Sequence, residues 1–344
     1  DYILTGYVNI PKCLELALHN GYDPMSKQQI GPKTGAVEDL KSYEDVWQAF
    51  KAQLEHCIDV KMRGNQIIER IFAEMMPAPF LSICTDDCIS KGKDYNTGGA
   101  RYSTRYMQGV GISDVTDALV SIKYNVFDKK RFSLTELVKA MGDNFEGHPE
   151  IYNYVCNKTP KYGNDDEYAD EVMIGAFNEY KDYISGRPTV NGGTDMLPTT
   201  CHVYFGDVMI ADAGGRRAHM PLADGISPTK GGDTNGPTSV VTSCAKMDQR
   251  HTGGCLLNQK FTPAALAGQK GIDNLAALIR SYFEMWGHHL QFNVISRETL
   301  LDAQKNPEEY KDLIVRVAGY SDYFNNLDPK LQNEIIERTE QEFA

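Results

Sequence analysis

The sequence predicts an α/β protein, because stretches with helical and with strand-like hydrophobic patterns alternate along its 344 residues. The clearest helix covers 272–286, where apolar residues recur at intervals of three and four. Short apolar runs at 291–295 and 313–317 are each typical of a strand. The hydrophobic content of 41% is enough for one large core or for two domains.

The first half of the chain is predicted to be mainly helical. A short loop is expected at 1–9, and an apolar helix follows at 10–19, closed by an Asn-Gly pair. A second helix begins behind Ser42, because Asp45 three residues later completes a capping-box pattern, and its apolar spacing continues to about residue 76. Two further helical stretches follow, at 113–124 and 133–141.

The second half mixes helices, strands and one long irregular segment. A helix is predicted at 171–185, and a strand at 197–205, which is rich in β-branched and aromatic residues. The glycine-rich segment 211–238 has little periodicity, and its length favours a functional loop. Two more helices are expected, at 297–306 behind the cap Ser296 and at 329–343 behind the cap Asp328.

Composition excludes several classes of protein. The net charge is −12 and there is no lysine- or arginine-rich run, so nucleic acid and anionic membranes are poor partners. The sequence contains no run of 18 apolar residues, so it predicts no membrane-spanning helix. The eight cysteines are scattered and show no C-x-x-C spacing, which favours reduced thiols in a cytoplasm. Cys84 and Cys88 form the one close pair, and without a second pair or a nearby histidine we expect no metal site.

The segment Arg316-Val317-Ala318-Gly319-Tyr320-Ser321-Asp322-Tyr323-Phe324 is the most informative feature of the chain. It resembles the signature loop of the glycyl radical enzymes, R-V-x-G-Y-S-x-x-F, in which the glycine stores an unpaired electron. A radical on a Cα needs a near-planar carbon between two amides, and glycine has no Cβ to crowd it. A lone Gly319 would more often be an ordinary strand-to-loop glycine, but nine positions in order favour the radical site. The resemblance implies that Arg316, Tyr320 and Phe324 pack this loop and shield Gly319.

Further segments carry the same resemblance through the rest of the chain. They are a glycine-arginine loop at 98–102, a G-R-x-A…P-L-A-D-G-x-S-P…G-P-T pattern across 215–238, and an H-x-Q-F-N-V strand at 289–294. The implied fold is the ten-stranded α/β barrel of the family. This chain would supply its second half at 1–285 and a glycyl radical domain at 286–344.

Catalysis in this family also needs a G-C-x-E loop, whose cysteine becomes a thiyl radical and whose glutamate acts as acid and base. The chain contains no such loop: Gly254 and Cys255 begin the pattern, but Leu257 replaces the glutamate. Cys255 is interpreted as buried packing. The opening residues resemble the stretch that follows the cysteine loop in relatives, so we expect the chain to be the C-terminal portion of a longer enzyme.

Within the family, the opening residues and the Asp322 variant of the radical loop resemble the subfamily that dehydrates 4-hydroxyproline to a pyrroline carboxylate. That resemblance implies that Tyr7 contacts the substrate, and Thr199 and Thr200 are candidates for binding its carboxylate or amine. It also implies a partner, a radical S-adenosylmethionine activating enzyme that creates the glycyl radical on Gly319. No other cofactor is expected in turnover. The resemblance to the family also implies a homodimer in the cytoplasm.

Two alternatives stay open from the sequence. The first is another carbon–oxygen or carbon–nitrogen lyase of the same family, such as a glycerol or propanediol dehydratase. The second is a non-catalytic, radical-bearing fragment or subunit. Small stand-alone glycyl radical proteins of that kind are little more than the radical domain, and residues 1–285 exceed this need.

Overall fold

The computed structural model describes residues 2–198 and 201–343, and it has the predicted mixture of helices and parallel strands. The helices are α1 (Ile10–Leu18), α2 (Tyr43–Met75), α3 (Pro79–Ile83), α4 (Cys88–Lys91), α5 (Ile112–Ser121), α6 (Leu134–Gly142), α7 (Pro149–Asn157), α8 (Glu167–Ile184), α9 (His202–Asp207), α10 (Gly236–Ala245), α11 (Gly268–Glu284), α12 (Arg297–Lys305) and α13 (Pro329–Glu337). The strands are β1 (Tyr2–Asn9), β2 (Tyr22–Asp23), β3 (Gln28–Gln29), β4 (Thr104–Val110), β5 (Gly193–Pro198), β6 (Leu256–Phe261), β7 (His289–Val294), β8 (Ile314–Arg316), β9 (Ser321–Tyr323) and β10 (Glu340–Gln341).

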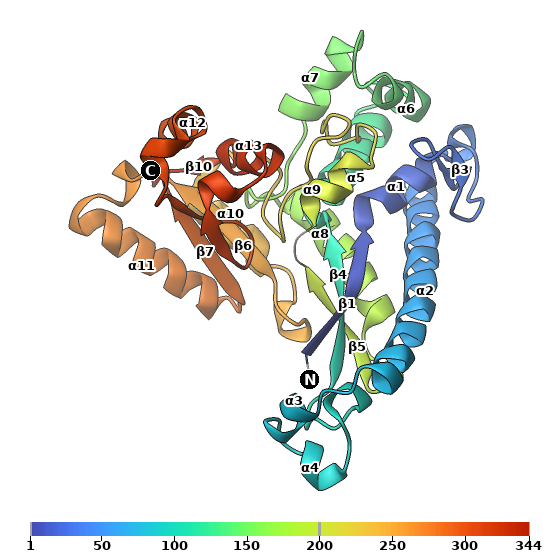
Figure 1. Ribbon diagram of the computed structural model, residues 1–344. Coiled ribbons are helices and arrows are strands. Elements are labelled where there is room, and N and C mark those ends of the chain that lie inside the picture. Colours follow the sequence, from blue (N-terminus) through green and yellow to red (C-terminus); the bar gives the residue numbers. More distant parts are fainter. Residues whose placement is uncertain (1, 199–200, 344) are drawn as a thin grey trace.

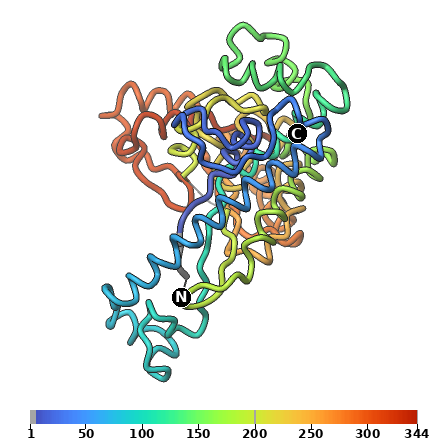
Figure 2. The backbone as a smooth tube through the Cα atoms, turned by 90° about the vertical axis from the view of Figure 1, so that its right-hand side faces the viewer, coloured from blue at the N-terminus to red at the C-terminus, as the bar shows by residue number. Residues whose placement is uncertain are grey.

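Two parallel sheets organise the described part of the chain. The first has the order β1-β4-β5 and the second the order β10-β6-β7, while β2-β3 and β8-β9 form small antiparallel pairs. In Figure 1 the second sheet lies with α11, α12 and α13 on one side of the molecule, and the first sheet lies beside α1 and α2 on the other. Figure 2 shows that the segment after α2 projects at the far end of this long helix.

Local signals place several helices where the sequence predicts them. Ser42 caps α2, and the side chain of Asp45 accepts a hydrogen bond from the backbone N–H of Ser42, so the capping box is complete. Ser296 caps α12 and Asp328 caps α13 through their side chains alone, by accepting hydrogen bonds from backbone N–H groups of the first turn. The α5 helix continues as a π-helix over 122–128, which extends the predicted stretch.

Three predictions about elements are wrong, each because a distant partner decides the conformation. Residues 2–9 form strand β1 instead of a loop, since they pair along β4. The strand predicted at 197–205 ends at Pro198, opposite Gly109 of β4, and α9 follows. The last helix ends at Glu337 rather than near residue 343, because 340–341 pair with β6 as β10. Strands β4 and β6 have no counterpart among the predicted elements.

The core has two main parts. A large cluster joins α1, α2, α5 and α8 beneath the first sheet and continues to the second sheet at Phe261. A smaller cluster joins α12 and α13 to the β8–β9 hairpin through Val315, Val317 and Phe324. The β8–β9 hairpin is therefore anchored to α12 and α13 by its own apolar side chains.

Candidate functional site

The first candidate region lies at the carboxyl ends of β1, β4 and β5, which meet at one edge because the strands are parallel. Ligands of parallel α/β folds commonly bind at such an edge. Tyr7 of β1 pairs in register with Gln108 of β4, and its side chain is 38% exposed. Its ring stands edge-on to Phe205 with the ring centres 6.3 Å apart. Tyr7 thus offers an accessible phenol at the edge.

Two side chains that the sequence did not single out, Gln108 and Cys201, lie close enough to the Tyr7 hydroxyl to influence its pKa. Burial raises the pKa of Tyr7, Gln108 lowers it, and the Cys201 thiol raises it. Gln108 is only 2% exposed. A glutamine between Met107 and Val110, in the apolar second half of β4, is the signal in the sequence that would have drawn attention to it.

Thr199 and Thr200, the other predicted substrate contacts, lie outside the described residues. Their neighbours are described: Pro198 ends β5, and Cys201 has the left-handed φ of +76° directly before α9. Since Cys201 lies close enough to the Tyr7 hydroxyl to raise its pKa, the structure brings Tyr7 near the residue that follows the two threonines.

Gly319 occupies the turn between β8 and β9, at a φ of +77°. The N–H of Val317 donates to the carbonyl oxygen of Tyr320 at 2.9 Å and closes this turn. A Cβ added to Gly319 would meet Leu256 Cδ1 at 3.5 Å, an ordinary contact, so the positive φ rather than lack of space favours glycine here. Gly319 itself is exposed in this chain.

The three residues predicted to pack this loop differ in their surroundings. Phe324 is fully buried in the cluster of α12 and α13. Tyr320 is 49% exposed, so in this chain its ring does not enclose Gly319. Burial and Asp322 raise the pKa of Tyr320, and Tyr204 of α9 adds to the rise. The turn with Gly319 therefore lies near α9, directly after the segment of the two threonines.

Arg316 is fixed by two residues of β7. Its backbone N–H donates to Asn293 Oδ1 at 2.7 Å, and Asn293 Nδ2 donates to the carbonyl oxygen of Arg316 at 2.7 Å. The guanidinium donates to Gln291 Oε1 and, at 3.2 Å, to Ser321 Oγ. Residues two apart on a strand share one face. The Q-F-N order of β7 therefore aims both amides at the base of the radical loop.

A buried chain of amides continues from β7 to the long loop. Gln291 Nε2 donates to Asn258 Oδ1, and Asn258 Nδ2 donates to a carboxylate oxygen of Asp224 and, at 3.4 Å, to the carbonyl oxygen of Val317. Each of the three side chains is less than 9% exposed. Three segments thus converge on the radical loop: the P-L-A-D-G segment, the middle of β6, and β7. A buried network whose hydrogen bonds are all satisfied favours a single conformation of the loop it holds.

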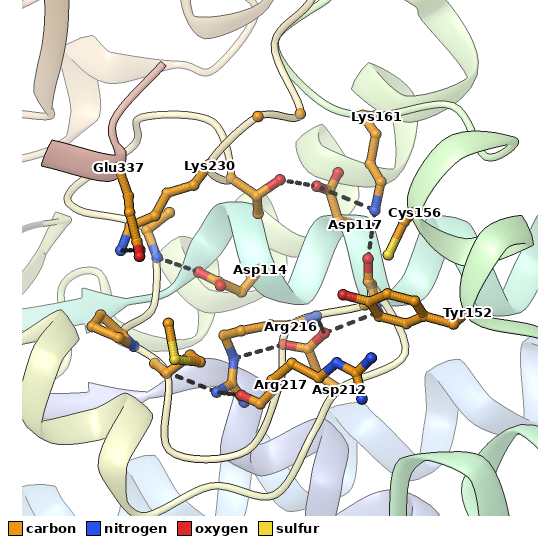
Figure 3. A pocket seen from close by; sticks show the side chains of 18 of the residues that line it. Asp114, Asp117, Tyr152, Cys156, Lys161, Asp212, Arg216, Arg217, Lys230 and Glu337 are labelled. Atoms are coloured by element: carbon orange, nitrogen blue, oxygen red, sulfur yellow. Dashed lines mark hydrogen bonds and ion pairs between the residues drawn. The ribbon is translucent and has the colours of Figure 1, made fainter. Parts of the chain in front are cut away.

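A charged cavity of about 380 Å³ lies apart from Gly319 and Tyr7, neither of which lines it. It opens between α5, α7, the loop at 212–232 and the end of α13 (Figure 3). Burial and Asp212 raise the pKa of Asp114 there to about 7. Arg216 binds Asp212 at 2.9 Å, and Lys161 donates to the carbonyl oxygen of Gly214 at 2.7 Å. These charges hold the long loop in place, which accounts for the G-R-x-A segment.

Other residues considered in the sequence have structural roles. Cys255 is fully buried, and burial raises the pKa of its thiol to about 12, so it is the packing residue that was predicted. Arg101 pairs with Asp87 at 3.0 Å in an exposed loop. In 2–198 and 201–343 no group of three histidine, cysteine or acidic side chains is arranged to hold a metal ion. No described helix has the length and apolar character needed to cross a membrane.

Comparison with known proteins identifies the class to which this fold and loop belong. The family model "Pyruvate formate lyase-like" matches residues 1–206, and the model "Glycine radical" matches 222–325. The chain belongs to the pyruvate formate lyase-like family and carries a glycine radical domain. The resemblance drawn from the Gly319 loop is confirmed.

The chain is 62% identical to the trans-4-hydroxy-L-proline dehydratase of Clostridioides difficile over 99% of its own length and 44% of that enzyme. The solved structure of the C. difficile hydroxyproline dehydratase with trans-4-hydroxy-L-proline bound matches with a TM-score of 0.96 at 61% identity, over 98% of this chain and 43% of that chain. The glycerol-bound B12-independent glycerol dehydratase from Clostridium butyricum matches with a TM-score of 0.94 at 41% identity, over 98% and 43%. The predicted α/β fold of the glycyl radical enzyme type is confirmed, and the chain spans less than half the length of these relatives.

Proposed function

We propose that this chain belongs to a glycyl radical dehydratase that removes water from trans-4-hydroxy-L-proline and gives a pyrroline carboxylate. The observation that carries the proposal is the 62% identity to the C. difficile dehydratase over 99% of the chain, which includes both the Gly319 turn and the strand with Tyr7. In this proposal Gly319 stores the radical, and the edge at Tyr7 and Cys201, with Thr199 and Thr200, forms one wall of the substrate pocket. Residues 1–285 are the barrel part and 286–344 the radical domain.

The reaction balances as an elimination with no net oxidation. The Gly319 radical takes a hydrogen atom from a cysteine thiol, and the thiyl takes one from the ring carbon next to the carbon that bears the hydroxyl. The hydroxyl leaves as water with a proton from a glutamate acting as acid, and the glutamate regains a proton from the ring nitrogen as the C=N bond forms. The product radical regains a hydrogen atom from the thiol. The cysteine and glutamate are expected in a G-C-x-E loop outside this chain.

We expect Tyr7 to orient the substrate. Its phenol stands 38% exposed at the edge, beside Gln108 and Cys201, and its ring packs edge-on against Phe205. A side chain that is already packed against a neighbour loses little freedom when it binds a ligand, which favours a defined pose for the substrate. We expect Tyr7 to contact the polar groups of the proline ring.

The partners follow from the chemistry. We expect a radical S-adenosylmethionine enzyme to create the radical at Gly319, which is exposed in this chain. The remainder of a longer polypeptide is expected to cover Gly319 in the working enzyme, as a stored radical requires protection from water and oxygen. We expect a homodimer in an oxygen-free cytoplasm, with no other bound cofactor in turnover.

The test is turnover by the activated full-length polypeptide. We expect a pyrroline carboxylate from trans-4-hydroxy-L-proline and at least about a hundredfold lower kcat/KM with glycerol or propane-1,2-diol, as for a site built around a specific polar substrate. Tyr7→Phe should lower kcat/KM for hydroxyproline about tenfold, the value of one hydrogen bond. Turnover of a diol with none of hydroxyproline would replace the proposal by the diol dehydratase alternative. An intact mass of 38.5 kDa would instead favour a radical-bearing subunit.

A further inference from the structure

Helix α9 lies between strand β1, which carries Tyr7, and the proposed radical domain at 286–344. On one side Asn9 Nδ2 donates to the carbonyl oxygen of Phe205 at 3.2 Å, and the Phe205 ring contacts Tyr7 edge-on. On the other side His202, which is 3% exposed, places Nε2 3.5 Å from a carboxylate oxygen of Glu334 on α13. This six-residue helix therefore touches both the expected substrate edge and the radical domain.

Glu334 in turn holds the residue that contacts the radical loop. Its carboxylate binds the guanidinium of Arg338 at 2.8 Å. The same guanidinium donates to the carbonyl oxygen of Val317 at 2.8 Å and to that of Arg316 at 3.3 Å. These carbonyls lie two and three residues before Gly319. Arg338 thus binds one carboxylate and two loop carbonyls together, which the planar fork of arginine permits and an ammonium does not.

The charges of this group are stable inside the fold. Burial alone would raise the pKa of Glu334, but Arg338, His202 and Lys230 outweigh it and hold the pKa well below its usual range. Burial would lower the pKa of Arg338, but Asp224, at 3.8 Å, and Glu334 raise it. Glu334 is 1% exposed and Arg338 is 8% exposed. Removing one partner of a buried pair leaves an uncompensated charge, so this contact is hard to open.

We propose that His202, Glu334 and Arg338 are positioning residues that fix Gly319 relative to the substrate edge beside Tyr7. The inference rests on the proposed function, because it assigns these residues a task in the hydrogen transfer between Gly319 and the cysteine thiol that acts on the substrate. Hydrogen transfer needs reacting atoms held in a near-attack geometry, and a displacement of about 1 Å costs about 100-fold in rate. A rigid path from Val317 through α13 and α9 supplies that geometry.

The test is Arg338→Lys in the activated full-length enzyme, with the radical counted by EPR. Lysine keeps the positive charge beside Glu334 but cannot reach the carboxylate and both carbonyls together. We expect kcat per radical to fall at least about tenfold, with the KM for trans-4-hydroxy-L-proline unchanged, because no substrate contact is removed. Arg250→Lys is the matched control: Arg250 is exposed and lies over Trp286, and this variant should keep the turnover of the unsubstituted enzyme.

Two outcomes would overturn the proposal. One is an unchanged kcat per radical in Arg338→Lys; the other is a folded variant that never acquires the EPR doublet, since Arg338 would then serve activation. If circular dichroism shows that Arg338→Lys does not fold, Glu334→Gln and His202→Gln test the proposal instead, and kcat per radical is measured for each of them.

A measurement without substrate separates this proposal from the function on which it rests. The decay of the EPR doublet under argon should be at least about tenfold faster in Arg338→Lys, because a displaced loop exposes the radical to other hydrogen donors. If the unsubstituted enzyme carries the radical but gives no pyrroline carboxylate, the proposed function fails, and a faster decay still supports the positioning role. Equal decay rates in that case would overturn both.

Discussion

Replacing Gly319 with alanine would separate the shape of the radical loop from its chemistry. The φ of Gly319 is +77°, a region that costs a residue with a Cβ about 1–2 kcal/mol. The new methyl group would meet Leu256 Cδ1 at 3.5 Å, so no clash adds to this cost. Alanine also restricts the unfolded chain, which offsets about 0.4–1 kcal/mol. The net loss of stability should be about 1 kcal/mol, and the fold should survive.

Two assays on full-length protein check this reasoning. Thermal unfolding should show a drop of about 2 °C, and EPR after treatment with the activating enzyme should show no glycyl doublet. Gly186→Ala is the matched control, because Gly186 has a φ of +74° and no atom within 4 Å of the added Cβ. It should lose similar stability and keep the doublet. A doublet that persists in Gly319→Ala would refute the assignment of the radical to Gly319. A loss of stability far beyond that of Gly186→Ala would refute the inference that the positive φ alone, without a clash, disfavours alanine at this position.

Two further changes test the loop that supports the site. Gly225→Ala should destabilise the protein by about 3 kcal/mol, which a lower unfolding temperature would show. Gly225 has a φ of +56°, and the new Cβ would lie 2.1 Å from the carbonyl oxygen of Leu256. Near-normal stability would contradict the close approach of this loop to β6. Asp114 has a folded pKa of about 7 against an ordinary value of 3.8, so the folded state binds its proton more tightly and stability falls as pH rises from about 4 to 7. This difference in pKa corresponds to at most about 4 kcal/mol of unfolding free energy. Asp114→Asn should therefore be more stable than the unsubstituted protein at pH 7 and equally stable at pH 4. A gain in stability that urea unfolding shows to be independent of pH would count against the raised pKa.

The fold is predictable from sequence where the signals are local. The capping box at Ser42 and the caps at Ser296 and Asp328 lie within a few residues of the helices they start, so the beginnings of α2, α12 and α13 are predicted correctly. Strands β1, β4 and β6 are missed or misassigned because their hydrogen-bond partners are distant in the sequence. The early end of α13 has the same cause, since β10 pairs with β6.

The radical loop, and through it the family, can be predicted from the amino-acid sequence alone. That was possible because radical storage depends on the covalent structure of one glycine and its immediate neighbours, which a nine-residue pattern records. The residues that hold this loop become evident only in the folded chain: Gln291 and Asn293 bind Arg316, and Arg338 binds the carbonyl oxygen of Val317. These contacts join segments 21 to 25 residues apart. A side-chain amide or guanidinium acquires such a partner only when packing removes water and leaves one buried carbonyl within its reach.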